Sequence, residues 1–344
     1  MERDRTLDLM KGVAIVAMIV GHLGWRGPEY KWIFSFHMPL FFIISGFLHG
    51  RISLSGESVA KQFKRLVLPY VVSACAIGAG YLFLSMFAEA ADERGLSYWV
   101  KAVFWGAGIG HHHSPLLADV PSIGAIWFLL AMFWCRLMFN LLAMISTRPG
   151  VLATASVAVS VVCIAVHHRV VNLPLSILPG GSALVFYTAG YLLRLYDGFS
   201  RISLPVAAVL LVLWVVSTYL SPYTLQVVGC SYPVYPLSVA GAIAATGVIY
   251  FCCKKLLSLR LRALDVVVWL GEVSLVILCL HDFDLMVPVR ERLGITMPLT
   301  SIVYDLTFCT LGTVLLSQFA ATRKIFKLKK NSDNPLKAWL FRGK

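Results

Sequence analysis

The sequence predicts an all-α, polytopic membrane helix bundle with about ten transmembrane helices and both termini in the cytoplasm. Hydrophobic residues make up 58% of the 344 positions and charged residues 14%, and the mean hydropathy is +0.78. Soluble proteins carry about 25% charged residues. Apolar stretches of roughly 20 residues, each able to cross a hydrocarbon core about 30 Å thick, recur along the whole chain. We therefore expect residues 1–344 to form a single integral membrane domain.

The apolar stretches define the expected spans. These are residues 9–26, 31–49, 66–88, 124–145, 150–167, 173–194, 203–220, 229–252, 264–281 and 297–319. The first is expected to be a retained helix, because acidic residues accompany the basic ones before it and no small-residue cleavage site follows. An eleventh segment, residues 98–110, is short and interrupted by three glycines. We interpret it as re-entrant or interfacial.

The distribution of basic residues supports ten crossings. With the N-terminus inside, ten crossings place the cluster at residues 254–262 and the basic tail on the cytoplasmic side, as the positive-inside rule requires. An eleventh crossing would place both outside. In a membrane protein, a net charge of +13 is typical of cytoplasmic loops that face anionic lipid. We expect membrane lipid, and no nucleic acid, among the partners.

The sequence contains no pattern typical of a metal site. The eight cysteines are scattered mostly through apolar stretches without a CxxC pair. Three consecutive histidines at 111–113 follow the eleventh segment in a loop, where consecutive side chains rarely point at one metal. We expect no metal.

Polar residues within membrane spans are functional candidates, because they cost several kcal/mol unless they are paired or face a watery cavity. Lys11 and His22 lie eleven residues apart, about three helical turns, so they share one helix face about 16 Å apart. His37 enters the second span to about 10 Å, a depth similar to that of His22. A short connection makes neighbours of these two helices, so the two imidazoles are expected to share a site.

Further ionisable residues gather toward the extracytoplasmic half. His281 and Asp282 end the ninth span, and Asp305 lies just inside the outer end of the tenth. A single membrane histidine can also serve only as a hydrogen-bonding group between helices, and His281 with Asp282 can be interfacial polar residues at a helix end. Arg136, in the middle of the fourth span, is interpreted as a structural or lipid-snorkelling residue.

A basic loop precedes the third span. It contains Lys61, Lys64 and Arg65. Lipid headgroups and topology explain such a loop, and so does binding of a phosphorylated cytosolic donor. The sequence leaves both explanations open.

Two N-terminal motifs resemble a known family. Residues 8–22, with Lys11 and His22 at their key positions, resemble the Arg/Lys-x10-His signature of acyltransferase family 3. Residues 34–48, Phe-Ser-Phe-His-Met-Pro-Leu-Phe-Phe-Ile-Ile-Ser-Gly-Phe-Leu, resemble the family's FHMPLFFxISGF segment, especially in its fucose 4-O-acetylase-like branch. Weaker similarities occur at residues 65–70, 127–129 and 271–281. The sequence departs from the family's late Ile-Tyr-Leu-x-His, which reads Ile-Leu-Cys-Leu-His at residues 277–281.

The resemblance implies a multi-pass enzyme of the bacterial cytoplasmic (inner) membrane. It would transfer an acyl group, usually acetyl, from cytosolic acyl-CoA to a hydroxyl of an extracytoplasmic glycan. O-antigen, capsule, exopolysaccharide and a lipid-linked oligosaccharide precursor all remain open as the acceptor. The alternative is a secondary transporter or exporter of a glycan or small solute, which predicts internal repeats that are not visible here.

Roles for individual residues follow from the chemistry of O-acyl transfer. His22 is the expected general base, because a neutral imidazole accepts a proton near pH 7. His37 is expected to be its partner or to stabilise the oxyanion. The acetyl-CoA phosphates are assigned to the basic residues Lys11, Lys61, Lys64 and Arg65, and Lys11 is also expected to be a catalytic residue together with His22 and His37. Acceptor binding is assigned to Trp127, His281, Asp282 and Asp305.

Overall fold

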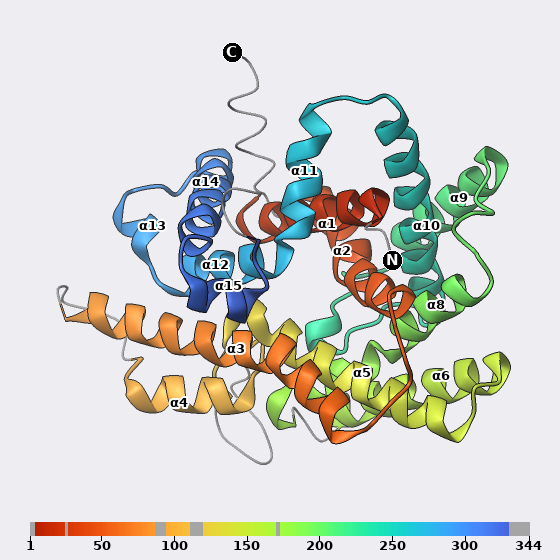
Figure 1. Ribbon diagram of the computed structural model, residues 1–344, viewed down its shortest axis with the longest axis horizontal. Coiled ribbons are helices and arrows are strands. Elements are labelled where there is room, and N and C mark those ends of the chain that lie inside the picture. The colour runs from red at the N-terminus through yellow and green to blue at the C-terminus, as the bar shows by residue number, and fades with distance from the viewer. Residues whose placement is uncertain (1–3, 25–26, 87–93, 111–119, 170–172, 330–344) are drawn as a thin grey trace.

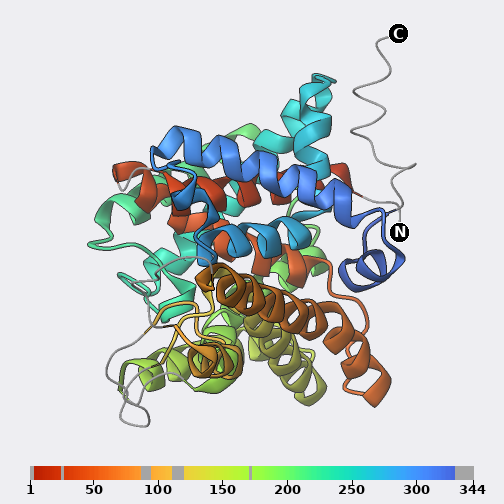
Figure 2. The ribbon, with the colours of Figure 1, turned by 90° about the vertical axis from the view of Figure 1, so that its left-hand side faces the viewer.

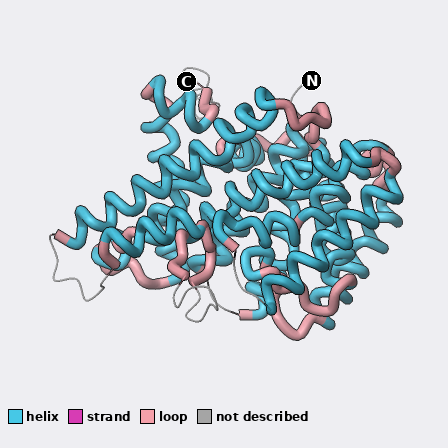
Figure 3. Tube along the Cα trace, turned by 90° about the horizontal axis from the view of Figure 1, so that it is seen from below, coloured by secondary structure: helices cyan, strands magenta, loops and turns pink. Residues whose placement is uncertain are grey.

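The chain folds into helices joined by loops, as Figure 3 shows. The computed structural model describes residues 4–24, 27–86, 94–110, 120–169 and 173–329. Over these ranges no β-strand is formed, and extended structure consists of isolated bridge residues, among them the pairs Ala107 with Ser122 and Gln226 with Ser231. The predicted all-α class is confirmed.

The helices follow the expected apolar segments. They are α1 (Arg5–Leu23), α2 (Pro28–Phe47), α3 (Gly56–Ser85), α4 (Leu96–Trp105), α5 (Trp127–Ile145), α6 (Pro149–Arg169), α7 (Ile177–Ser182), α8 (Leu184–Leu195), α9 (Leu204–Leu220), α10 (Leu237–Ser258), α11 (Ala263–Glu272), α12 (Ser274–Met286), α13 (Val289–Arg292), α14 (Pro298–Leu316) and α15 (Ala320–Phe326) (Figure 1). Short 3-10 turns η1 (Gly124–Ile126), η2 (Pro174–Ser176) and η3 (Val227–Gly229) precede α5, α7 and α10.

The length and composition of these helices indicate a multi-pass membrane protein. In the described part of the chain, six helices are long and apolar enough to cross a membrane: α1, α3, α5 extended by η1, α6, α10 and α14. Two bent pairs, α7 with α8 and α11 with α12, raise the number to as many as eight. The helices α2 and α9 are not among them. Ten crossings and a cytoplasmic location for both ends stay predictions.

Two expected spans are broken rather than continuous. The segment 264–281 divides into α11 and α12, which meet at a bend of 80° where Val273 leaves helical geometry. The segment 173–194 divides into α7 and α8 at a bend of 51°, just after Pro179, Gly180 and Gly181. Proline and glycine favour such breaks. The bend between α11 and α12 directs α12 toward α14 and α3, where Figure 2 shows it.

The basic segment before the third span is helical, which corrects its assignment as a loop. Helix α3 begins at Gly56, ten residues before the expected start, so Lys61, Lys64 and Arg65 lie on it. The Ser55 side chain caps this start by accepting a hydrogen bond from the backbone N–H of Ser58. The apolar stretch gave no sign of this extension, because the added turns are polar.

The short eleventh segment forms α4, a helix of ten residues. At 1.5 Å per residue it is about 15 Å long, about half the thickness of a hydrocarbon core. It ends at Gly106, whose φ of +62° is left-handed. The histidines at 111–113 lie outside the described residues.

Glycines allow two close helix crossings. A side chain at Gly12 of α1 or Gly271 of α11 would run into the backbone of the other helix, at Val267 and Asp8 respectively. Gly46 of α2 and Gly190 of α8 meet the backbone at Tyr187 and Ile43 in the same way. Small residues let membrane helices approach this closely. The crossing of α11 over α1 lies near the centre of Figure 1, and it fixes the first helix within the bundle.

Candidate active site

A small cavity of about 40 Å³ contains the two predicted histidines. His22 reaches it from the last turn of α1 and His37 from the middle of α2, while residues 225–228 and Trp127 line the other side. The His22 side chain is exposed to this space, whereas His37 is 1% exposed. The Phe34 ring lies against both imidazoles.

His22 is the first member of a hydrogen-bonded relay. Its Nδ1 lies 2.9 Å from Nε2 of His281, and Nδ1 of His281 lies 2.9 Å from Oδ2 of Asp305. The two imidazoles are nearly parallel, with ring planes 12° apart. His281 and Asp305 have no exposed surface, so helices α12 and α14 hold the relay in a dry environment behind His22.

The relay sets the tautomer of His22. When Oδ2 of Asp305 accepts the hydrogen bond, Nδ1 of His281 carries the proton and donates it. Nε2 of a neutral His281 is then an acceptor, and Nδ1 of His22 must donate to it. Nε2 of His22 is left with a free lone pair in the cavity. This geometry suits a general base, because the proton that His22 accepts is stabilised through His281 by Asp305.

His37 is placed differently from its predicted roles. Its Nδ1 lies 2.9 Å from the backbone oxygen of Ile33, so it must donate there, and the imidazole that bonds His22 is that of His281. A neutral His37 has no proton left on Nε2. It can therefore stabilise an oxyanion only when doubly protonated, whereas as a neutral ring it accepts a hydrogen bond.

Three of the four predicted acceptor-binding residues do not reach the cavity. His281 and Asp305 lie behind His22, and Asp282 is fully buried, where its Oδ1 accepts a hydrogen bond from the backbone N–H of Ala125. Asp282 thus anchors the start of η1 and α5 instead of facing a ligand. Only Trp127 lines the cavity. Acceptor binding by the four residues stays a prediction.

A larger cavity of about 220 Å³ lies farther along the first helix. Lys11, Arg65 and Lys327 line it together with Glu272 and an apolar wall that includes Phe41 and Phe128. Nζ of Lys11 lies 2.6 Å from Oδ1 of Asp8. This cavity combines cationic ends with an apolar interior.

The two cavities share a wall. Met18, Met38 and Leu278 line both of them. Methionine side chains are flexible and adapt to what they contact. A ligand that occupies the larger cavity is therefore separated from His22 by three apolar side chains and by no buried ion pair.

The remaining residues that were predicted to bind acetyl-CoA do not line the larger cavity. Lys61 and Lys64 are exposed on α3 and do not line it. Lys327, which does, follows α15 and was not predicted, because its position near Arg65 depends on the packing of the C-terminal segment onto α3. Glu272 has a partner in Lys329, with Nζ 3.4 Å from its Oε2.

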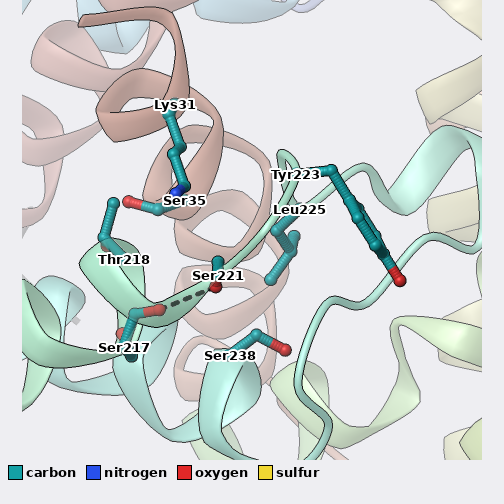
Figure 4. A pocket seen from close by; sticks show the side chains of 8 residues that line it. All are labelled: Lys31, Ser35, Ser217, Thr218, Ser221, Tyr223, Leu225 and Ser238. Carbon is teal, nitrogen blue, oxygen red and sulfur yellow. Dashed lines mark hydrogen bonds between the residues drawn. The ribbon is translucent and has the colours of Figure 1, made fainter. Parts of the chain in front are cut away.

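A hydroxyl-lined pocket adjoins the histidine cavity, with Leu225 in both linings (Figure 4). It is formed by Lys31, Ser35, Ser217, Thr218, Ser221, Tyr223, Leu225 and Ser238. Most of its serines use their protons within the helices; Ser221, for example, donates to the Ser217 backbone oxygen at 2.7 Å. The hydroxyls of Thr218 and Ser238 are buried without a hydrogen-bond partner among the described residues.

The fold and the site therefore define a multi-pass membrane protein with a histidine relay, buried at His281 and Asp305, beside a cation-lined cavity. Acyltransferase family 3, described as an acyltransferase domain, matches residues 4–321. The chain belongs to this family and is a membrane-bound O-acyltransferase.

Two curated proteins are similar to part of this chain at low sequence identity. The nodulation protein NolL of Sinorhizobium fredii is 26% identical over 164 residues, which cover 41% of this chain and 37% of that protein. The nodulation protein NolL of Mesorhizobium japonicum is 25% identical over 154 residues, which cover 38% and 34%. The match thus spans little more than a third of each relative's length. No solved structure matches.

Proposed function

We propose that this protein transfers an acyl group, in particular acetyl, from cytosolic acyl-CoA to a hydroxyl of an extracytoplasmic glycan or its lipid-linked precursor. The observation that carries the proposal is the relay from Asp305 through His281 to His22, which leaves a basic nitrogen in a cavity. The adjoining cation-lined cavity supports a donor with phosphates at one end and an apolar arm.

The transfer step uses His22 as general base. Nε2 of His22 takes the proton of the acceptor hydroxyl while that oxygen attacks the thioester carbonyl carbon. The tetrahedral intermediate then collapses, the carbon–sulfur bond breaks, and the imidazolium returns the proton to the coenzyme A sulfur. The products are an ester and free coenzyme A. Neither a metal nor a redox step is needed to balance the reaction.

The wall between the cavities determines where the reaction occurs. The acyl carbonyl must pass Met18 and Met38 to reach His22, while the nucleotide part of the donor stays in the larger cavity. His37, as a neutral acceptor, would take a hydrogen bond from a neighbouring hydroxyl of the acceptor, because the single proton of the attacking hydroxyl goes to His22. The hydroxyl-lined pocket beside Leu225 has a volume of about 10 Å³, room for about one water molecule, so it would offer hydroxyl groups to an acceptor without enclosing a sugar.

The test compares His22→Ala with His168→Ala in purified protein. His168 is an exposed histidine at the end of α6, remote from both cavities, and serves as the matched control. With radiolabelled acetyl-CoA and a glycan acceptor, H22A should lose at least about a thousandfold in kcat and still bind coenzyme A, whereas H168A should behave as wild type. Wild-type turnover by H22A would refute the assignment. Flux of glycan without acetyl transfer would support a transporter instead.

A further inference from the structure

A second polar cluster lies where the end of α2 meets α5 and α8. His49 follows α2 and is 1% exposed. Its Nδ1 lies 2.8 Å from the hydroxyl of Tyr187, and Nη1 of Arg194 donates to its backbone oxygen at 2.5 Å. Arg136 of α5 is within electrostatic reach of both His49 and Tyr187. The close crossing at Gly46 and Gly190 holds this group together.

Three arginines gather here without acidic partners. Arg65 on α3 is within electrostatic reach of Arg136, which in turn is within reach of His49 beside Arg194. We call Arg65, Arg136 and Arg194 the arginine cluster. Within the described ranges, none of the three forms an ion pair with an Asp or Glu side chain. Arg65 and Arg194 are exposed and Arg136 is half-buried, so solvent screens part of their mutual repulsion, but the excess of positive charge still favours a bound anion.

Two buried nitrogens at the cluster lack hydrogen-bond partners among the described residues. They are Nε of Arg136 and Nε2 of His49. When the Tyr187 hydroxyl donates to Nδ1 of His49, the proton of the neutral ring is on Nε2, which becomes a free donor. Buried polar atoms are nearly always paired, so unpaired donors beside excess positive charge indicate a missing group that accepts hydrogen bonds.

The cluster reaches the larger cavity through Arg65, whereas Arg136, Arg194 and His49 are not part of the cavity lining. Arg65 lines that cavity and is also the member of the cluster that lies within reach of Arg136. The planar guanidinium binds phosphate through two parallel hydrogen bonds, and several such groups together select an anion with more than one phosphate. A donor whose arm fills the apolar cavity would therefore have its charged end at this cluster.

We propose that the arginine cluster, together with His49, binds the phosphate groups of the nucleotide part of the donor. This inference rests on the proposed function and adds Arg136, Arg194 and His49 to the binding site. It also gives Arg136 a role other than contact with lipid. Lys61 and Lys64, which are exposed outside the cavity, become peripheral to phosphate binding.

The test measures binding of coenzyme A and of S-acetylpantetheine, which lacks the phosphates. The full chain is purified in a detergent with a neutral headgroup, and binding is followed by calorimetry for wild type, Arg136→Gln, Arg136→Lys and Arg169→Gln. Arg169 is an exposed arginine at the far end of α6 and is the matched control. R136Q should lower the affinity for coenzyme A at least about tenfold and leave the affinity for S-acetylpantetheine unchanged. The affinity of R136K for coenzyme A should lie between those of wild type and R136Q, because lysine keeps the charge but lacks the planar guanidinium.

Four outcomes separate the possibilities. An equal loss of both ligands in R136Q indicates a structural role and overturns the proposal, as does an unchanged affinity for coenzyme A. Arg136-dependent binding of vesicles containing anionic lipid, without phosphate-dependent binding of coenzyme A, assigns the cluster to lipid and also overturns it. If wild type binds coenzyme A in an Arg136-dependent way but transfers no acetyl, the phosphate site stands and the proposed function fails. If R136Q does not fold, R136K takes its place, and protection against thermal unfolding by coenzyme A is compared between R136K and wild type. Weaker protection of R136K supports the proposal, and equal protection overturns it.

Discussion

The two cavities differ in how far their polar groups are already satisfied. In the smaller one, His22 is held by His281 and Asp305, and His37 is held by the Ile33 backbone. At the larger one, Arg65 and the neighbouring Arg136 have no acidic partner among the described residues, although Lys11 pairs with Asp8. The reactive groups are thus preorganised without a ligand, while binding groups retain unpaired charge. This is the division expected when one cavity does chemistry and the other holds an anionic donor.

The largest expected effect comes from inverting the relay with Asp305→Asn. The Asn side chain can donate its N–H to Nδ1 of His281, which moves the proton of each imidazole to its other nitrogen and blocks Nε2 of His22. We expect kcat to fall about a thousandfold with coenzyme A affinity unchanged. Steady-state kinetics measure the first quantity and calorimetry the second.

The same variant tests whether the two cavities have separate roles. If D305N weakens coenzyme A binding as strongly as it lowers kcat, the relay and the donor cavity are one structural unit. Asp197→Asn, at an exposed aspartate after α8, should change neither quantity and is the matched control.

The sequence predicted that His22 and His37 share a site, and the structure places both in one cavity, but the contacts behind His22 were not predicted. The motif pointed to His22 and His37 because they lie at similar depth on adjacent helices. The contact between His22 and His281 joins residues 259 apart, and the one between His281 and Asp305 joins α12 to α14. Both depend on the bend at Val273, which redirects α12, and no local periodicity encodes that bend.

Glycines in the same motifs have a physical explanation that the resemblance did not supply. Gly12, next to Lys11, and Gly46, near the end of the second motif, are positions where another helix backbone leaves no room for a side chain. Arg136 is a residue whose surroundings could not be predicted from the sequence. Its position in mid-span favoured a lipid or structural role, because the sequence could not show that Arg65 lies within electrostatic reach of it and that both Arg136 and Arg194 act on His49.

The second prediction concerns the crossing behind the arginine cluster. In Gly46→Ala, the added methyl group meets the backbone at Tyr187, and helices α2 and α8 must separate. We expect a loss of about 2 kcal/mol in the free energy of unfolding, together with weaker coenzyme A binding, because His49 and Tyr187 move apart. Unfolding in detergent and calorimetry measure the two effects. Gly56→Ala, where the new methyl group meets nothing, should be neutral.

The third prediction tests the wall between the cavities. Met38→Phe replaces a flexible side chain with a rigid ring where both cavities meet, so the thioester should reach His22 less often. We expect about a tenfold decrease in kcat, with coenzyme A affinity unchanged. Met38→Leu, of similar volume, should stay close to wild type. Unchanged turnover in M38F would mean that the acyl group reaches His22 by another route.

The smallest expected effect distinguishes direct phosphate contact from general attraction. Lys64 is exposed on α3, whereas the next residue, Arg65, lines the larger cavity. Lys64→Ala should raise the KM for acetyl-CoA only about twofold at low salt, because an exposed charge acts through solvent. The effect should vanish at 1 M salt, where the Debye length is only about 3 Å. Arg65→Ala, in contrast, should keep a larger effect at high salt, since Arg65, although also exposed, lines the larger cavity and would bond the phosphates directly. A loss of tenfold or more in K64A that persists at 1 M salt would place Lys64 in direct contact with the donor and extend the anion site onto the exposed face of α3.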